Sequence, residues 1–308
     1  MHIDQTTVQR YLETRYQQVQ HLKHMADGWW AQAFSFTGDQ RQLVIRISRH
    51  IADFRKDEYA RTHFSSAAIP IPRIIATGPF SDGLYYCISA YCTGTPADDF
   101  METLTTAAAL PVAASLLETL EHIHQLDTQH LSGWGHTDAN GNGMFDSWEA
   151  WLSAIYNHKT PVSWQELAAA TWLEADLFRQ LITRMESLYP YLPREKKILH
   201  GDYGFDNVLL TPDGKISAVL DWSDMQLGDE LFDLIHMNEP WVNPPESVNY
   251  LQLWLEDRQR KGIATPHVNE RVTCYSIYYT LLHLHIYTTR QEEDSYREVA
   301  AWAKSCLL

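Results

Sequence analysis

The eight residues HGDYGFDN, from His200 to Asn207, contain two aspartates, an asparagine and two glycines. Carboxylate and amide oxygens are the ligands that magnesium prefers, and a carboxylate can also accept a proton from a hydroxyl group that attacks a phosphate. The same residue types are common in turns, where their side chains bond to nearby backbone groups. The run by itself therefore allows two interpretations, a phosphoryl-transfer site or an ordinary turn.

The spacing of these residues favours the first interpretation. Asn207 follows Asp202 by five residues, and Asp221 comes fourteen residues after Asn207, beyond the turn signal TPDG. Protein kinases place a magnesium-binding asparagine at the same interval after the catalytic aspartate, and a second magnesium-binding aspartate further along the chain. The sequence therefore predicts a kinase-like catalytic loop followed by a β-hairpin.

The elements that must position this loop differ between the two ends of the chain. Strands are predicted at 33–36 and 42–48 and in the segments PRIIATG and LYYCIS, and a helix in DFRKDEYARTHF. Apolar residues between Val8 and Leu22 fall near helical spacing and predict an opening helix. From about residue 105 the pattern is mainly helical. We therefore expect an α+β fold with a β-rich nucleotide-binding lobe, 1–92, and a larger, mainly helical catalytic and acceptor-binding lobe, 93–308.

Two longer blocks, HGDYGFDNVLL and AVLDWSDMQLGDELFDL, resemble the signature sequences of the aminoglycoside phosphotransferase family, which shares the two-lobed protein-kinase-like fold. Within that family, AFSF, KDEYARTHFSSAAIPIP and GLYYCIS are most similar to the hygromycin B phosphotransferases. The resemblance implies an enzyme that transfers the γ-phosphate of ATP or GTP to a hydroxyl of hygromycin B or a related aminoglycoside. Mg²⁺ would be its cofactor, and antibiotic resistance the consequence.

Carried onto this chain residue by residue, the resemblance also implies roles for single side chains. Asp202 would be the catalytic base, and Asn207 and Asp221 would be the magnesium ligands. His200 would brace the catalytic loop, and Gly228, Asp229 and Asp233 would support it from the following helix. For these last three residues, capping or surface solvation is an equally good explanation.

The nucleotide site implied by the resemblance departs from the usual kinase pattern. Arg46 takes the place of the lysine that normally binds the phosphates, and its carboxylate partner on the next helix would be Glu58 or Asp57, of which we favour Glu58. The loop over the phosphates, 26–32, has a single glycine, Gly28. Backbone groups of the connection between the lobes would hold the base, at Ser89, Ala90 and Cys92.

A polycationic acceptor must be held by carboxylates. Asp206, Asp224 and Glu239 lie in or just after the signature blocks, and with Asp202 they would bind the acceptor. Trp241 matches an aromatic position of the hygromycin enzymes where a ring could stack on a sugar. Exposed acids and a core tryptophan would explain these residues equally well.

Two other functions stay open at this point. The same fold could act on another small hydroxylated substrate, such as a choline, an amino-sugar or a macrolide. Alternatively, Arg46 and the glycine-poor loop could belong to a catalytically silent nucleotide- or drug-binding protein. The intact set of Asp202, Asn207 and Asp221 argues against the silent protein.

Composition limits the possible partners. The 24 Lys and Arg residues against 39 Asp and Glu give a net charge of -15, which repels nucleic acid and attracts cations. The four cysteines lack zinc-site spacing and disulfide-scaffold density, which fits a reducing compartment. The N-terminus does not resemble a signal peptide, and no apolar run approaches the ~18 residues of a membrane span. We therefore expect a cytoplasmic, soluble monomer without nucleic-acid or membrane partners.

A second motif suggests a different ion. DANGNGMFDSWE, residues 138–149, has the residue types of a calcium-binding loop at the required positions. Such a loop needs an entering helix, however, and the preceding HLSGWGH contains two glycines. We therefore expect a glycine-containing turn here instead of a calcium site.

Overall fold

The computed structural model describes residues 3–27, 31–157, 162–204, 206–239 and 248–307. These residues form two compact units, and the chain passes between them several times. The first unit holds the described residues up to Leu126 together with Thr137–Gly141 and Asp202–Met225, and the second holds Asp127–His136, Asn142–Gly201 and the described residues from Gln226 onward. The predicted catalytic loop thus belongs to the same unit as the N-terminal strands. The lobe boundary between residues 92 and 93 stays a prediction.

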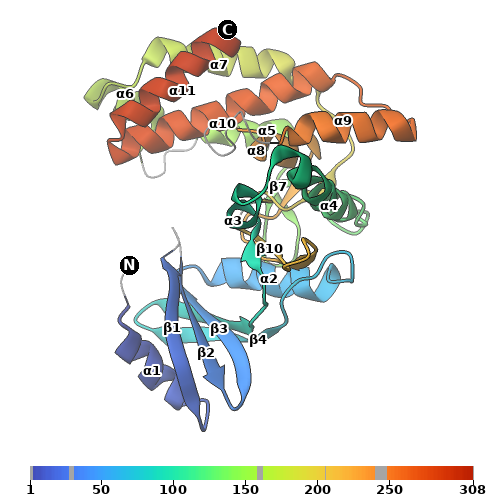
Figure 1. Cartoon of the computed structure of the whole chain (residues 1–308). Coiled ribbons are helices and arrows are strands. Elements are labelled where there is room, and N and C mark those ends of the chain that lie inside the picture. The colour runs from blue at the N-terminus through green and yellow to red at the C-terminus, as the bar shows by residue number, and fades with distance from the viewer. Residues whose placement is uncertain (1–2, 28–30, 158–161, 205, 240–247, 308) are drawn as a thin grey trace. The chain divides into compact units, whose positions relative to one another are not determined.

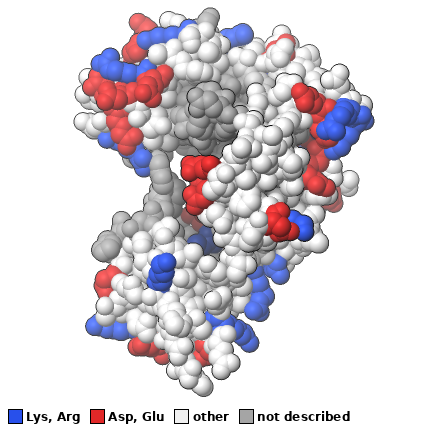
Figure 2. All heavy atoms as spheres, in the orientation of Figure 1, with Lys and Arg blue, Asp and Glu red and all other residues white. Residues whose placement is uncertain are grey.

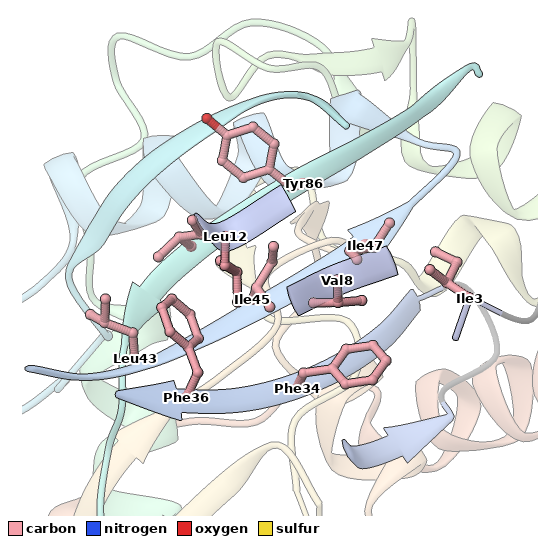
Figure 3. Close-up of a cluster of buried hydrophobic side chains, with 10 residues drawn as sticks. Ile3, Val8, Leu12, Phe34, Phe36, Leu43, Ile45, Ile47 and Tyr86 are labelled. Atoms are coloured by element: carbon pink, nitrogen blue, oxygen red, sulfur yellow. The ribbon is translucent and has the colours of Figure 1, made fainter. Parts of the chain in front are cut away.

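A five-stranded antiparallel sheet forms the N-terminal part of the first unit (Figure 1). Its strands, in spatial order, are β1 (Val19–Asp27), β2 (Ala31–Gly38), β3 (Arg41–Ser48), β5 (Leu84–Ala90) and β4 (Ile74–Ser81). Since side chains alternate along a strand, Phe34, Phe36, Ile45 and Ile47 are all buried on the same face. Figure 3 shows these side chains packed together with the residues of a helix that covers the face.

That covering helix is α1 (Gln5–Glu13), whose Val8 and Leu12 lie one turn apart and are fully buried. The prediction of an opening helix up to Leu22 is therefore wrong in its second half. Val19 and Leu22 lie on β1 and pack against the same core. Pairing of β1 with β2, in which Val19 faces Gly38, outweighs the local helical spacing.

The helix predicted after β3 is present as α2 (Ile51–His63). Its buried residues, Phe54, Asp57 and Ala60, recur every three positions and so share one side of the helix. The rest of the first unit comprises β6 (Thr95–Pro96), α3 (Ala97–Glu102), α4 (Thr106–His124), β10 (Val208–Leu210) and β11 (Ile216–Val219). Strands β10 and β11 form the predicted hairpin, and β6 extends it to a three-stranded sheet.

The second unit is mainly helical. Its strands form one sheet in the order β8 (Gly143–Phe145), β7 (Trp134–Thr137), β12 (Gln226–Gly228) and β9 (Lys197–Leu199). Its helices are α5 (Trp148–Asn157), α6 (Trp164–Ala170), α7 (Ala175–Leu188), α8 (Leu231–His236), α9 (Tyr250–Lys261), α10 (Val268–Arg290) and α11 (Glu293–Cys306), with a 3-10 turn at Tyr189–Tyr191. The long helix α10 packs against α5, α7, α8 and α11 and forms the centre of this core.

Charged side chains of both signs lie next to one another over the C-terminal helices at the top of Figure 2. Lys304 on α11 pairs with Glu174, with an Nζ to Oε2 distance of 2.6 Å, and Arg297 pairs with Glu293. Exposed pairs of this kind contribute little to stability. Within the described part of the chain, no helix combines the length and the apolar composition that crossing a membrane requires.

Candidate active site

The β10–β11 hairpin brings the two predicted magnesium ligands to the same end of the sheet. Val208 is paired with Val219, and the backbone N–H of Leu220 donates to the carbonyl of Asn207 at 2.7 Å. Asn207 accepts this hydrogen bond, and Asp221 directly follows the residue that donates it. The two residues therefore lie at the same end of the hairpin, although they are fourteen residues apart in the sequence. The other end of the hairpin is closed by the TPDG turn, where the N–H of Thr211 donates to the carbonyl of Lys215 at 2.8 Å.

The predicted catalytic residue, Asp202, is held directly by Asn207. The side-chain nitrogen Nδ2 of Asn207 donates to Asp202 Oδ2 at 2.8 Å and to the backbone carbonyl of Asp202 at 3.0 Å. With Nδ2 used in this way, the amide oxygen of Asn207 is the atom suited to a cation. The loop is further anchored by Tyr203, which is fully buried and donates from its hydroxyl to the carbonyl of Leu116 on α4 at 2.9 Å.

Asp221 has a backbone conformation that is unusual for a residue with a side chain. Its φ of 51° lies in the left-handed region, which costs on the order of 1 kcal/mol and is concentrated at functional sites. Its Oδ1 accepts a hydrogen bond from the N–H of Ser223 at 3.2 Å, and its Oδ2 lies 3.7 Å from Nη1 of Arg46. The carboxylate is thus directed toward a cationic side chain of the N-terminal sheet.

Arg46 forms its ion pair with Asp57, so the expectation that favoured Glu58 is corrected. Nη2 of Arg46 donates to Asp57 Oδ2, and Asp57 Oδ1 accepts from the backbone N–H of Trp222 at 2.9 Å. Glu58 instead bonds to Arg55 and to the hydroxyl of Thr77. Burial alone would lower the pKa of Arg46, but the adjacent carboxylates of Asp57 and Asp221 outweigh burial and raise it.

Two further aspartates of the same unit lie close enough to interact with the site. Burial raises the pKa of Asp224 to about 6, and the negative charges of Asp202 and Asp221 add to the rise. Asp206 is exposed at the surface, but partial desolvation by its neighbours still raises its pKa, and the charge of Asp202 adds to the rise. The site therefore concentrates negative charge around Asp202, which favours the binding of cations.

The residues present fit magnesium better than a metal held by protein side chains alone. Among the described residues, no three His, Cys, Asp or Glu side chains group closely enough to hold a metal ion. Mg²⁺ commonly takes one or two protein carboxylates and completes its shell with water and substrate phosphates. The carboxylate of Asp221 and the amide oxygen of Asn207 provide a partial set of that type.

The structure describes most of the predicted nucleotide site. Ser89 and Ala90 end strand β5, where Ser89 pairs with Val44 and the N–H of Ala90 donates to the carbonyl of Arg73 at 2.9 Å. Cys92 is half-buried just beyond the strand, with its Sγ 4.0 Å from the carbonyl of Ala90. Gly28 lies outside the described residues. The binding of the base by these backbone groups stays a prediction.

Glu239, another predicted acceptor residue, belongs to the second unit. Glu239 is 3% exposed and lies near two histidines. Its Oε1 is 3.7 Å from Nδ1 of His236, and its Oε2 is 3.5 Å from Nδ1 of His283. This burial argues against the alternative that Glu239 is simply an exposed acid, and its role in acceptor binding stays a prediction. Trp241 lies outside the described residues.

Asp233, on α8 of the second unit, braces the strand end before the catalytic loop, as predicted. Its two carboxylate oxygens accept hydrogen bonds from the backbone N–H groups of His200 at 3.1 Å and Gly201 at 2.9 Å. A second buried acid of this unit, Asp229, pairs with Arg271 and accepts a hydrogen bond from Tyr275. Sequence reasoning missed these two partners because they follow some forty residues later, on α10.

The calcium-loop motif has another structural explanation. It follows strand β7 instead of a helix and contains β8. Oδ1 of Asn142 accepts hydrogen bonds from the backbone N–H and the hydroxyl of Ser132, both at 2.9 Å, and Glu149 pairs with Arg194 at 2.9 Å. Asn142 thus stabilises the expected glycine-containing turn, and Glu149 takes part in an exposed ion pair.

Together, an antiparallel N-terminal sheet, a helix-borne carboxylate paired with a strand arginine, and an Asp–Asn–Asp set around a hairpin define a protein-kinase-like phosphotransferase fold. Residues 21–262 match the model of the phosphotransferase enzyme family, and the chain belongs to this family. The resemblance drawn from the two signature blocks is thereby confirmed.

Individual relatives share both sequence and fold. The chain is 32% identical over 239 residues to the hygromycin-B 4-O-kinase of Escherichia coli, covering 77% of this chain and 68% of that protein. A crystal structure of a thermostable mutant of aminoglycoside phosphotransferase APH(4)-Ia, a ternary complex with AMP-PNP and hygromycin B, matches with a TM-score of 0.80 and 26% identity over 98% of both chains. The GDP and kanamycin complex of APH(2")-IIia, 12% identical over 97% of both chains with a TM-score of 0.68, shares the fold.

Proposed function

We propose that this phosphotransferase transfers the γ-phosphate of ATP or GTP to a hydroxyl group of hygromycin B or a closely related aminoglycoside, with Mg²⁺ as cofactor. The observation that carries the proposal is the set of Asp202, Asn207 and Asp221 around one hairpin. The similarity to a hygromycin-B kinase supports the choice of acceptor.

In the proposed mechanism, Asp202 accepts the proton of the acceptor hydroxyl as that oxygen attacks the γ-phosphorus. The bond from the γ-phosphorus to the bridging oxygen of the β-phosphate breaks, and the nucleoside diphosphate leaves. The bond from Nδ2 of Asn207 fixes the orientation of the Asp202 carboxylate before the substrate arrives. Asn207 and Asp221 would hold Mg²⁺, which neutralises charge on the phosphates when it is bound. Arg46, kept charged by Asp57, adds a fixed positive charge beside Asp221.

Charge supports a cationic acceptor. Asp206 and Asp224 both interact electrostatically with Asp202, and their carboxylates would bind ammonium groups of an aminoglycoside near the reacting hydroxyl. The net charge of -15 supports the same choice and disfavours nucleic acid. Action as a cytoplasmic monomer, with phosphorylation of the antibiotic giving resistance, is part of this proposal.

The test is mass spectrometry of hygromycin B after incubation with the protein, Mg²⁺ and either ATP or GTP. We expect the mass of one added phosphate, and a rate that falls by about 10²- to 10⁴-fold in Asp202→Asn, the usual contribution of a general base. Asp213→Asn is the matched control, because Asp213 is exposed in the turn of the same hairpin and pairs with Lys215.

An unmodified antibiotic with both nucleotides would refute the choice of acceptor and direct the same assay to other aminoglycosides, amino-sugars, cholines and macrolides. Full turnover by Asp202→Asn would refute the mechanism, whatever the acceptor.

A further inference from the structure

Two consecutive residues of helix α2, Lys56 and Asp57, form hydrogen bonds with the backbone of the segment that follows Asp221. Asp57 accepts a hydrogen bond from the backbone N–H of Trp222 at 2.9 Å. Its neighbour Lys56 donates from Nζ to the backbone carbonyl of Ser223. The turn that follows the left-handed Asp221 is therefore fastened to α2 through one backbone N–H and one backbone carbonyl.

Lys56 is also a half-buried cation among carboxylates. Burial raises the pKa values of Asp53 and Asp224, and the positive charge of Lys56 acts on both in the opposite direction. Asp221 adds to the rise at both residues, so it belongs to the same group of interacting charges. The ammonium thus stabilises a cluster of negative charges that would otherwise repel one another.

We propose that Lys56 is a positioning residue for phosphoryl transfer, which holds the Ser223 carbonyl and thereby keeps the carboxylate of Asp221 directed at the magnesium site. The proposal rests on the proposed function, because it assigns Asp221 to the metal. In this proposal Lys56 acts through the backbone of the turn, because its Nζ donates to the carbonyl of Ser223.

The direction of the effect on magnesium separates positioning from simple electrostatics. If Lys56 contributed only its charge, its removal would leave the site more negative, and Mg²⁺ would bind more tightly. If Lys56 holds the turn, its removal frees the left-handed Asp221 to relax, and Mg²⁺ would bind more weakly. The two explanations therefore predict shifts of opposite sign.

The experiment is a magnesium titration of AMP-PNP binding, followed by calorimetry, on the whole chain with Lys56→Met and Lys56→Arg. We expect Lys56→Met to raise the half-saturating Mg²⁺ concentration by roughly tenfold, the effect of losing one charge-assisted hydrogen bond. Lys56→Arg keeps a donor and a charge, so it should recover most of the loss. Lys215→Met is the control, because Lys215 is 79% exposed in the TPDG turn and should leave the titration unchanged.

A half-saturating concentration that is unchanged or lower in Lys56→Met would overturn the proposal. The readout does not depend on the acceptor, so an error in the choice of hygromycin B leaves the test valid. A wild-type protein that binds neither AMP-PNP nor GMP-PNP in the presence of Mg²⁺ would refute the proposed function and this inference together. Melting temperatures of the three variants separate loss of the turn from general unfolding.

Discussion

Substitutions at Asp57 and Glu58 can test which carboxylate stabilises Arg46. In the structure the buried partner of Arg46 is Asp57, whereas the sequence favoured Glu58. Asp57→Asn keeps the shape of the side chain and an oxygen for the N–H of Trp222, but it removes the charge that faces Arg46. Glu58→Gln is the matched control one residue away. Glu58 pairs with Arg55 in an exposed bond and accepts a half-buried hydrogen bond from the hydroxyl of Thr77.

The expected magnitudes follow from the exposure of each pair. Removing one partner of a buried ion pair costs about 3–5 kcal/mol. Here the Asp57 side chain is 5% exposed and Arg46 is 21% exposed, and Asp221 stays near Arg46, so we expect about 2–3 kcal/mol. The side chains of Arg55 and Glu58 are 48% and 30% exposed, so Glu58→Gln should cost about 0.2–1 kcal/mol.

The assay is urea unfolding of the two variants, of Arg46→Met and of the double variant Arg46→Met with Asp57→Asn. Because the double variant no longer buries an unpaired charge, it should lose less than the sum of the two single changes. The activity of Asp57→Asn should also fall through a higher KM for the nucleotide, since Arg46 is no longer fixed. A larger loss of stability in Glu58→Gln than in Asp57→Asn would refute the assignment.

Two further predictions concern pH and backbone conformation. The pKa of Asp224 is about 6 in the folded chain against 3.8 in the unfolded chain, so the folded state keeps a proton that the unfolded state loses, and stability falls as pH rises through this window. Without Mg²⁺ or nucleotide, Asp224→Asn should therefore be as stable as the wild type at about pH 4, and its free energy of unfolding should be higher by about 1–3 kcal/mol at about pH 7. The measurement is urea unfolding at both pH values. A difference in stability that does not change with pH would contradict the raised pKa of Asp224 as its cause. Gly133→Ala should cost about 3 kcal/mol or more, because φ is +68° and its Cβ would lie 2.0 Å from the carbonyl oxygen of Gly143. Gly83, at φ +75° with nothing within 4 Å, is the control and should cost about 1 kcal/mol; equal melting temperatures for the two variants would rule out the clash.

Much of the catalytic loop could be predicted from the sequence because its geometry is local. The TPDG turn sets the hairpin, and the hairpin register then places Asn207 beside Asp221. The five-residue interval from Asp202 to Asn207 is short enough for one side chain to bond to the other within a single loop. Strand alternation likewise predicts the buried face of β3, since a side-chain period of two requires no knowledge of the partner strand.

Tertiary structure decided the features that depend on which surface an element buries. Residues 57 and 58 are neighbours, but successive positions on a helix point about 100° apart, so only the packing of α2 makes Asp57 the partner of Arg46. The three-residue spacing of Phe54, Asp57 and Ala60 does indicate one side of a helix. However, an aspartate at the middle position is expected to be exposed unless a buried cation, here Arg46, is known to pair with it. The positioning role of Lys56 could not be predicted from the sequence, because its acceptor is a backbone carbonyl 167 residues away. Every residue has such a carbonyl, so the residue type does not show which one accepts a hydrogen bond.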